Sequence, residues 1–206
     1  IRGRLSMTSH VDYYFSVASP WTYLGHERFS KLAERHDLDV SFRPVDFTRV
    51  LHASGGLLYQ HRSEQRRRYR QVELDRWRHY LDIALTLEPA YYPVDRTPAG
   101  LLMVACRHLP QQTRFGLLQA ILASIWRDNL DISNWQVLTS LLNNEGPDAD
   151  AILAETRQPA CQHLLERHTD DAIEAGVFGV PSYVLEEEIF WGQDRLDLLA
   201  RALEAG

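Results

Sequence analysis

The feature that most constrains the fold of this chain is the point where an extended segment passes directly into a helix, at Ser19-Pro20-Trp21-Thr22. The residues before it alternate with a period of two, which is typical of a β-strand, and one side carries Val11, Tyr13, Phe15 and Val17. A helical repeat follows, with apolar or aromatic residues at Phe29, Leu32, Ala33 and His36. The sequence therefore predicts Ser19 as the helix N-cap and Pro20 as the first helical residue.

This helix start is also the first candidate functional site. A helix N-terminus presents unpaired N–H groups and about half a positive charge to whatever lies in front of it. A C-x-x-C pair here would predict a thiol–disulfide redox site, but the two cysteine positions hold hydroxyls, Ser19 and Thr22. Ser19 is either a capping residue alone or a catalytic residue whose hydroxyl also donates to a ligand, and the two interpretations are compatible.

The remaining pattern predicts a sheet interrupted by a long helical block. Leu38, Val40 and Phe42 alternate with polar residues, so a second strand and a parallel βαβ unit are expected, followed by an irregular segment over 44–62. From about Ser63 the period is helical for more than a hundred residues. Two short apolar runs, 182–185 and 189–191, then predict a hairpin, and a last helix is expected after Gly192.

The order of these elements predicts an α/β fold of the thioredoxin-like βαβ-ββα type with a large all-helical insertion. The expected thioredoxin-like domain comprises residues 10–60 and 175–206, and the inserted helical domain comprises residues 61–174. Residues 1–6 do not begin with methionine and are interpreted as an expression remnant ahead of Met7.

Composition narrows the possible partners. The 206 residues are 45% hydrophobic and carry a net charge of −6, which is ample for a core and argues against general binding to nucleic acid or anionic membranes. The basic run at 66–68 is predicted to be a solvated helix face. Two cysteines exclude a disulfide framework, and Cys106, in an apolar run, is predicted to be a buried thiol. No apolar run reaches the roughly 18 residues of a membrane span, and no signal peptide is visible, so a cytoplasmic location is expected.

Metal and hydrolase chemistry find little support. None of the nine histidines shows the i, i+4 spacing with a carboxylate that a metal site uses, so no metal ligands are predicted. Ser19 is not part of a G-x-S-x-G turn, and no histidine can be assigned as its base.

Two C-terminal segments are further candidates. Val180-Pro181 opens a predicted strand, and a cis bond there would leave the Val180 N–H and C=O free to pair with an extended ligand; the alternative is an ordinary trans strand start. Trp191-Gly192-Gln193-Asp194 is expected at the start of the last helix. There, bare N–H groups would bind a carboxylate and Asp194 an ammonium, or Asp194 is simply a first-turn acid favoured by the helix dipole.

These segments together resemble the 2-hydroxychromene-2-carboxylate isomerase family and its relatives, the kappa-class glutathione transferases, within the DsbA-like thioredoxin folds. The resemblance rests on Tyr14-Phe15, residues 19–25, 73–77 and 178–181, and residues 191–196. It implies an enzyme, a homodimer, and glutathione as cofactor. It also implies that Ser19 hydrogen-bonds the glutathione sulfur, that Val180 and Pro181 pair with the cysteinyl backbone, and that Gln193 and Asp194 hold the γ-glutamyl end. The cofactor-binding residues expected from it are Ser19, Pro20, Trp21, Val180, Pro181, Trp191, Gly192, Gln193 and Asp194.

The physical chemistry of the site agrees with this resemblance. A thiol with a pKa of about 8.5 is mostly protonated at pH 7. A helix N-terminus and one hydroxyl donor would stabilise its anion by roughly 1.5–2 kcal/mol, lowering the pKa by about 1–1.5 units. Three functions remain open: a glutathione-dependent cis–trans isomerase of a small aromatic-degradation intermediate, a kappa-like transferase or peroxidase, and a non-catalytic module that binds extended peptides at Pro181.

Overall fold

The sheet at the centre of the fold has four strands, and the computed structural model describes it within residues 8–146 and 148–205. The interpretation of residues 1–6 as an expression remnant lies outside the described residues. The strand order is β2-β1-β3-β4, where β1 pairs in parallel with β2 and antiparallel with β3. The strands are β1 (His10–Phe15), β2 (Asp39–Pro44), β3 (Ser182–Leu185) and β4 (Glu188–Trp191). The expected βαβ unit and the C-terminal hairpin are both present.

Helix α1 (Pro20–Arg35) connects the two parallel strands, and its start is the one that the sequence predicts. Ser19 has extended backbone angles (φ −82°, ψ 125°), and its Oγ accepts a hydrogen bond from the Thr22 N–H at 3.2 Å. Pro20 is the first helical residue, where its fixed φ fits and its missing N–H costs nothing. β1 ends at Phe15, so a tight turn over 16–18 delivers the chain to the helix start.

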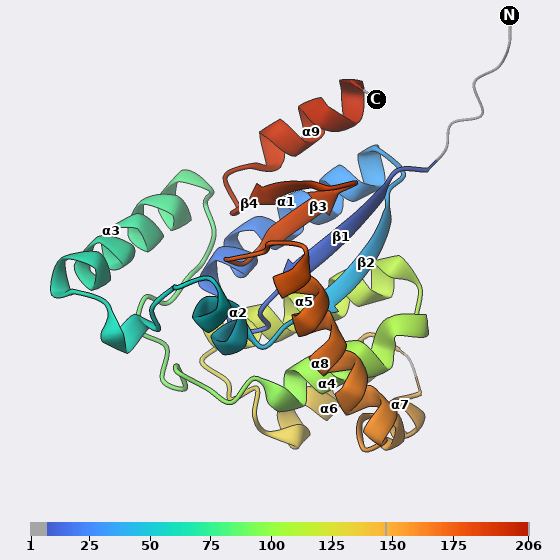
Figure 1. Ribbon diagram of the computed structural model, residues 1–206. Helices are drawn as coiled ribbons and strands as arrows, with labels where there is room; N and C mark the ends of the chain where they lie inside the picture. Colours follow the sequence, from blue (N-terminus) through green and yellow to red (C-terminus); the bar gives the residue numbers. More distant parts are fainter. Residues whose placement is uncertain (1–7, 147, 206) are drawn as a thin grey trace, which may run out of the picture.

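Both faces of the sheet are covered, which is why β1 is buried on both sides. On one face, Tyr13 stacks on Tyr183 with ring centroids 5.2 Å apart, and α1, α5 (Gln111–Trp126) and α9 (Leu196–Ala205) contribute to the same core. On the other face, Tyr14 and Val184 pack in a smaller cluster. Figure 1 shows α2 and α8 in front of the sheet and α1 behind it.

The helical block is long, as expected, but it is not continuous. It contains α3 (Glu64–Tyr80), α4 (Thr97–Ala105), α5, α6 (Trp135–Asn144), α7 (Ala149–Thr156) and α8 (Pro159–Glu174). Irregular segments over 81–96 and 127–134 interrupt it. Asp82 and Asn129 adopt positive φ values of 52° and 53°, a conformation that ends a helix. Consequently the helical period that the sequence predicts from about Ser63 is interrupted after Tyr80, and Leu81 and Ala84 lie beyond the end of α3.

Two sequence predictions are wrong at the level of single elements. The segment 44–62 is not irregular throughout, because α2 (Phe47–Ala53) forms within it. The Asp46 side chain caps this helix by accepting a hydrogen bond from the Thr48 N–H, and Val50 and Leu51 are buried. The last helix does not begin directly after Gly192. It begins at Leu196, so residues 192–194 form a turn before it.

Other predictions about exposure are confirmed. Cys106 is fully buried, and burial raises the pKa of its thiol to about 12, so it is an inert core residue. The arginines at 66–68 are exposed on α3. Within the described ranges, no helix combines the length and the apolar character needed to cross a bilayer.

Candidate active site

Ser19 lies in the turn between β1 and α1 and is 8% exposed. Its oxygen accepts a hydrogen bond from the Thr22 N–H, which is the capping interaction. A serine hydroxyl has one proton to donate as well, and no acceptor for this proton is found among the described residues. The Ser19 hydroxyl therefore caps the helix and keeps its donor available, as the second interpretation of this residue requires.

The backbone of the first helical turn leaves one further donor. Pro20 has no N–H, the Thr22 N–H is taken by Ser19 Oγ, and the Tyr23 N–H donates to the Ser19 carbonyl at 3.0 Å. Within the described part of the chain, the Trp21 N–H has no such partner. The Ser19 O–H and the Trp21 N–H thus both belong to the first turn of α1, at its positive end, which favours an anion.

Thr22 occupies the position of the second cysteine in a C-x-x-C motif, but its hydroxyl does not join the Ser19 O–H and the Trp21 N–H as a donor. Its side chain is fully buried, and its Oγ1 has no hydrogen-bond partner among the described residues. The cavity described below does not include it. The two hydroxyls are therefore not equivalent, because only that of Ser19 belongs to a residue that lines the cavity.

A cavity of about 540 Å³ opens in front of Ser19, within the size range of small-molecule sites. Three parts of the chain build it: the β1–α1 turn with α2, the segment from Leu58 to Gln71, and the loop from Leu87 to Arg96. The C-terminal half of the fold closes it with Phe178, Gly179, Val180 and Trp191. Of the predicted cofactor-binding residues, this single cavity is lined by Ser19, Pro20, Trp21, Val180 and Trp191.

The Val180–Pro181 bond is cis, as the sequence analysis considers. Neither the N–H nor the C=O of Val180 has a hydrogen-bond partner in the described ranges, whereas the Pro181 carbonyl accepts from the Gly192 N–H at 2.8 Å. A free backbone donor and acceptor on one residue can pair with an extended ligand, as an added strand does. Val180 is therefore the residue of this pair that faces the cavity, and Pro181 is buried behind it.

Trp191 forms one wall of the cavity and is held by the segment that precedes Val180. Its ring lies 4.7 Å from the ring of Phe178 in an edge-to-face arrangement. A Cβ atom on Gly179 would collide with the Trp191 indole, so only glycine lets the tryptophan lie against this backbone. Sequence position alone gives no sign of this contact, although a glycine directly before the Val-Pro pair is consistent with it.

Gly192, Gln193 and Asp194 are not among the residues that line the cavity. Gln193 is 2% exposed, and Arg28 Nη2 donates to both its backbone carbonyl, at 2.8 Å, and its side-chain oxygen. Asp194 is exposed and pairs with the neighbouring Arg195 at 2.7 Å. The expectation that these residues start the last helix is wrong, because Asp197 is the acid in the first turn of α9.

The cavity contains a group of residues that the sequence analysis does not predict. Among the described residues that line it, the charged side chains are Arg62, Arg70, Arg96 and Glu88, and the aromatic ones outside the predicted set include Tyr59 and Tyr92. From the sequence, only the basic run at 66–68 is interpreted, as a solvated helix face, and no role is assigned to Arg62 or Arg70. Arg66 to Arg68 do face solvent, but Arg62 and Arg70 are half-buried and face inward. Sequence spacing does not separate these arginines, because Arg66 and Arg70 are four residues apart on α3 and Arg62 precedes the helix.

The model of the DSBA-like thioredoxin domain matches residues 10–204, so the chain belongs to that family. A 2-hydroxychromene-2-carboxylate isomerase from Sphingobium xenophagum is 30% identical over 94% of this chain and 97% of its own length. The human protein named glutathione S-transferase kappa 1 is 24% identical over 94% of this chain and 90% of its own length.

A solved structure of a 2-hydroxychromene-2-carboxylate isomerase covers 95% of each chain with a TM-score of 0.78 and 26% identity. These relatives are named as enzymes, and this protein is an enzyme. The resemblance that the sequence motifs indicate is confirmed, and so is the DsbA-like fold with its helical insertion.

Proposed function

We propose that this enzyme is a glutathione-dependent cis–trans isomerase of the 2-hydroxychromene-2-carboxylate isomerase type. The observation that carries the proposal is the Ser19 hydroxyl, which caps α1 through its oxygen and keeps its proton available at the wall of the cavity. Isomerases with this name are about 30% identical to the chain over nearly its whole length. The name of the kappa-class relative supports glutathione as the thiol.

The residues at the cavity fit glutathione in three respects. The Ser19 O–H and the Trp21 N–H are free donors for a thiolate at the positive end of a helix. The Val180 backbone has a free donor and a free acceptor for the peptide part of the ligand. Because Ser19 has replaced a cysteine, the protein has no thiol here that could form a mixed disulfide with the cofactor.

When bound, glutathione supplies a thiolate for reversible addition to an activated double bond. Ser19 donates its proton as a hydrogen bond to the sulfur and so favours the thiolate over the thiol. The N-terminus of α1 acts in the same direction, and together they are worth roughly 1.5–2 kcal/mol. Val180 orients the peptide backbone, while Trp21, Trp191 and Tyr92 contribute aromatic surface to the cavity.

Further assignments belong to the same proposal. Gln193 and Asp194 are assigned to the γ-glutamyl end. This requires the Asp194 carboxylate to exchange its ion pair with Arg195 for one with the ligand ammonium, and it requires the buried Gln193, whose side-chain oxygen accepts from Arg28, to become accessible. The two-part domain division, the homodimer, the cytoplasmic location and a role in aromatic degradation follow from the sequence analysis and the resemblance in the same way.

A second candidate function is glutathione transfer, because the kappa-class relative also aligns over 94% of the chain. The same thiolate would then attack an electrophile and remain attached to it. Isothermal calorimetry with glutathione, followed by turnover of 2-hydroxychromene-2-carboxylate and of a panel of transferase electrophiles, tests both functions. We expect glutathione binding and isomerisation. Absence of binding at millimolar glutathione would contradict both candidates.

A further inference from the structure

Arg70 has an unusual setting in the cavity. Its guanidinium carbon lies 4.9 Å from the centroid of the Tyr59 ring and 5.8 Å from that of the Tyr92 ring. Contacts with two aromatic faces hold the guanidinium in place but leave its N–H edge without an anion. In the described parts of the chain, no carboxylate forms an ion pair with it.

Arg62 is the second cation on this wall that forms no ion pair with an acidic residue in the part of the chain that the structure describes. Its Nε donates to the Leu57 carbonyl at 2.9 Å, which fixes the side chain and leaves both terminal nitrogens available. Burial, followed by the positive charges of Arg66 and Arg70, lowers its pKa. Two arginines that repel each other in a half-buried wall are stabilised by an anion between them.

Arg96 brings a third guanidinium to the same cavity from the loop before α4. Its Nη2 donates to Thr48 Oγ1 at 2.8 Å, so α2 positions it, and within the described ranges it forms no ion pair with an acid. Glu88 is the acidic residue that lines the cavity, and it is exposed. The wall therefore has an excess of positive charge, although the whole chain carries a net charge of −6.

We propose that Arg62, Arg70 and Arg96 form a carboxylate-binding wall of the active-site cavity, with Arg70 as the residue that selects an anionic ligand. The planar guanidinium matches a carboxylate through two parallel hydrogen bonds, and the flanking Tyr59 and Tyr92 favour a carboxylate on a flat, apolar body. The inference rests on the proposed function, in which two ligands carry such a group: the glycyl end of glutathione and the carboxylate of the aromatic substrate.

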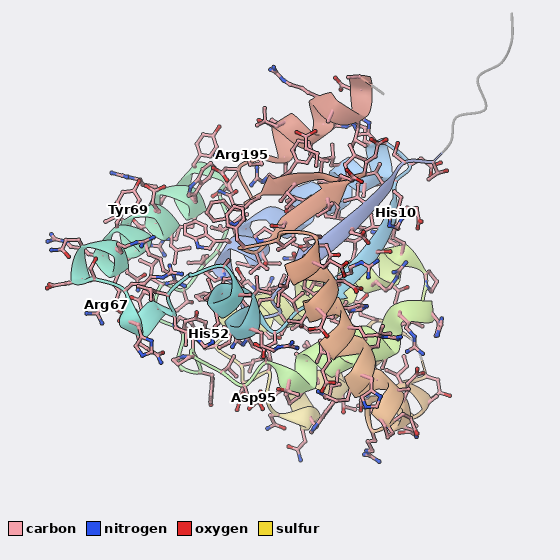
Figure 2. The ribbon with its side chains drawn as sticks, in the orientation of Figure 1. His10, His52, Arg67, Tyr69, Asp95 and Arg195 are labelled. Carbon is pink, nitrogen blue, oxygen red and sulfur yellow. The ribbon has the colours of Figure 1, made fainter. Side chains whose placement is uncertain are left out.

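The test compares each carboxylate with a neutral counterpart, using the full chain. Glutathione is compared with its glycyl ethyl ester, and 2-hydroxybenzoate with 2-hydroxybenzamide, each by calorimetric titration. The variants are Arg70→Gln and Arg96→Gln, from different segments, so that a folding defect in one leaves the other informative. The matched control is Arg67→Gln, which removes the same charge as Arg70→Gln from the same helix. Arg67 is exposed on the outer side of α3 (Figure 2) and is not among the residues that line the cavity.

We expect Arg70→Gln and Arg96→Gln to weaken binding of at least one carboxylate about tenfold or more, while its neutral counterpart and the Arg67→Gln control change less than about twofold. The pair that responds identifies which carboxylate the wall binds. Equal effects on the charged and neutral members of both pairs, or an equal loss in Arg67→Gln, would overturn the inference. Failure of the proposed function is distinct, because it shows as loss of glutathione binding in the unaltered protein while 2-hydroxybenzoate binding still reports on the wall.

Discussion

Replacing Ser19 with alanine separates the two tasks assigned to this hydroxyl. Ser19→Ala removes the 3.2 Å capping bond to the Thr22 N–H, which costs about 1 kcal/mol of stability. It also removes the proton donated to the bound sulfur. Of the roughly 1.5–2 kcal/mol assigned to the hydroxyl and the helix N-terminus together, the hydroxyl supplies about 1–1.5 kcal/mol, so the substitution should lower kcat/KM by about five- to tenfold at 1.36 kcal/mol per factor of ten. The fold should remain, because Pro20 and the apolar face of α1 are unchanged.

The assay is glutathione-dependent isomerisation of 2-hydroxychromene-2-carboxylate, alongside the free energy of unfolding from urea denaturation. Asn134→Ala is the matched control, since Asn134 caps α6 by accepting from the Gln136 N–H at 2.8 Å and does not line the cavity. It should lose a similar amount of stability and keep its turnover. Ser19→Ala with full turnover, or an equal loss of turnover in Asn134→Ala, would refute the catalytic assignment of Ser19.

Two further substitutions test the core and the γ-glutamyl assignment. Burial lowers the pKa of His26 to about 4, while its Nε2 donates to the Phe115 carbonyl at 2.9 Å, so this histidine is neutral in the folded protein. The unfolded chain gains a proton below pH 6.5 and the folded chain does not, so about 3 kcal/mol of stability is lost as the pH falls from 6.5 toward 4. His26→Gln should remove that share of the pH dependence, measured by urea denaturation. Asp194→Asn should leave stability within about 0.5 kcal/mol and weaken glutathione binding several-fold without weakening that of the dipeptide Cys-Gly, which lacks the γ-glutamyl group.

The controls for these two predictions lie in the chain and in the ligand. Burial also lowers the pKa of His168 to about 4. In the His26→Gln variant, His168 should therefore still contribute to the slope of the free energy of unfolding against pH. An unchanged slope in that variant would mean that His26 does not titrate between folded and unfolded states. An equal effect of Asp194→Asn on glutathione and on Cys-Gly would exclude Asp194 from binding the γ-glutamyl ammonium.

The fold was predictable from the sequence where short-range rules decide. The Ser19-Pro20 helix start and the alternation in β1 and β2 depend on local geometry, and each appears at or within a few residues of the expected place. Helix α2 was missed because it is only seven residues long and precedes Ser54-Gly55-Gly56, whose composition favours a turn. Its stability comes from the Asp46 cap and from packing of Val50 in the smaller core, which is a long-range contact.

The candidate site was predictable only on the side that carries motifs. Ser19, Val180 and Trp191 come from segments separated by about 160 residues, and the fold brings them to one cavity as the motif order predicts. The opposite wall could not be predicted, because Arg62, Arg70 and Arg96 acquire their orientation from the docking of α3 and of the loop at 87–96. Gln193 shows the converse case: its motif position is clear, but Arg28, distant in sequence, occupies its side-chain oxygen.

The central claim is that the N-terminus of α1 binds the sulfur of glutathione as a thiolate. The pKa of the protein-bound glutathione thiol tests this claim most directly. That pKa is measured by titrating the ultraviolet absorbance of the thiolate in the complex against free glutathione. We predict that binding lowers it by about 1–1.5 units, and that Ser19→Ala reverses most of this change. A bound thiol that titrates like free glutathione, or a lowered pKa that survives Ser19→Ala unchanged, would contradict the claim.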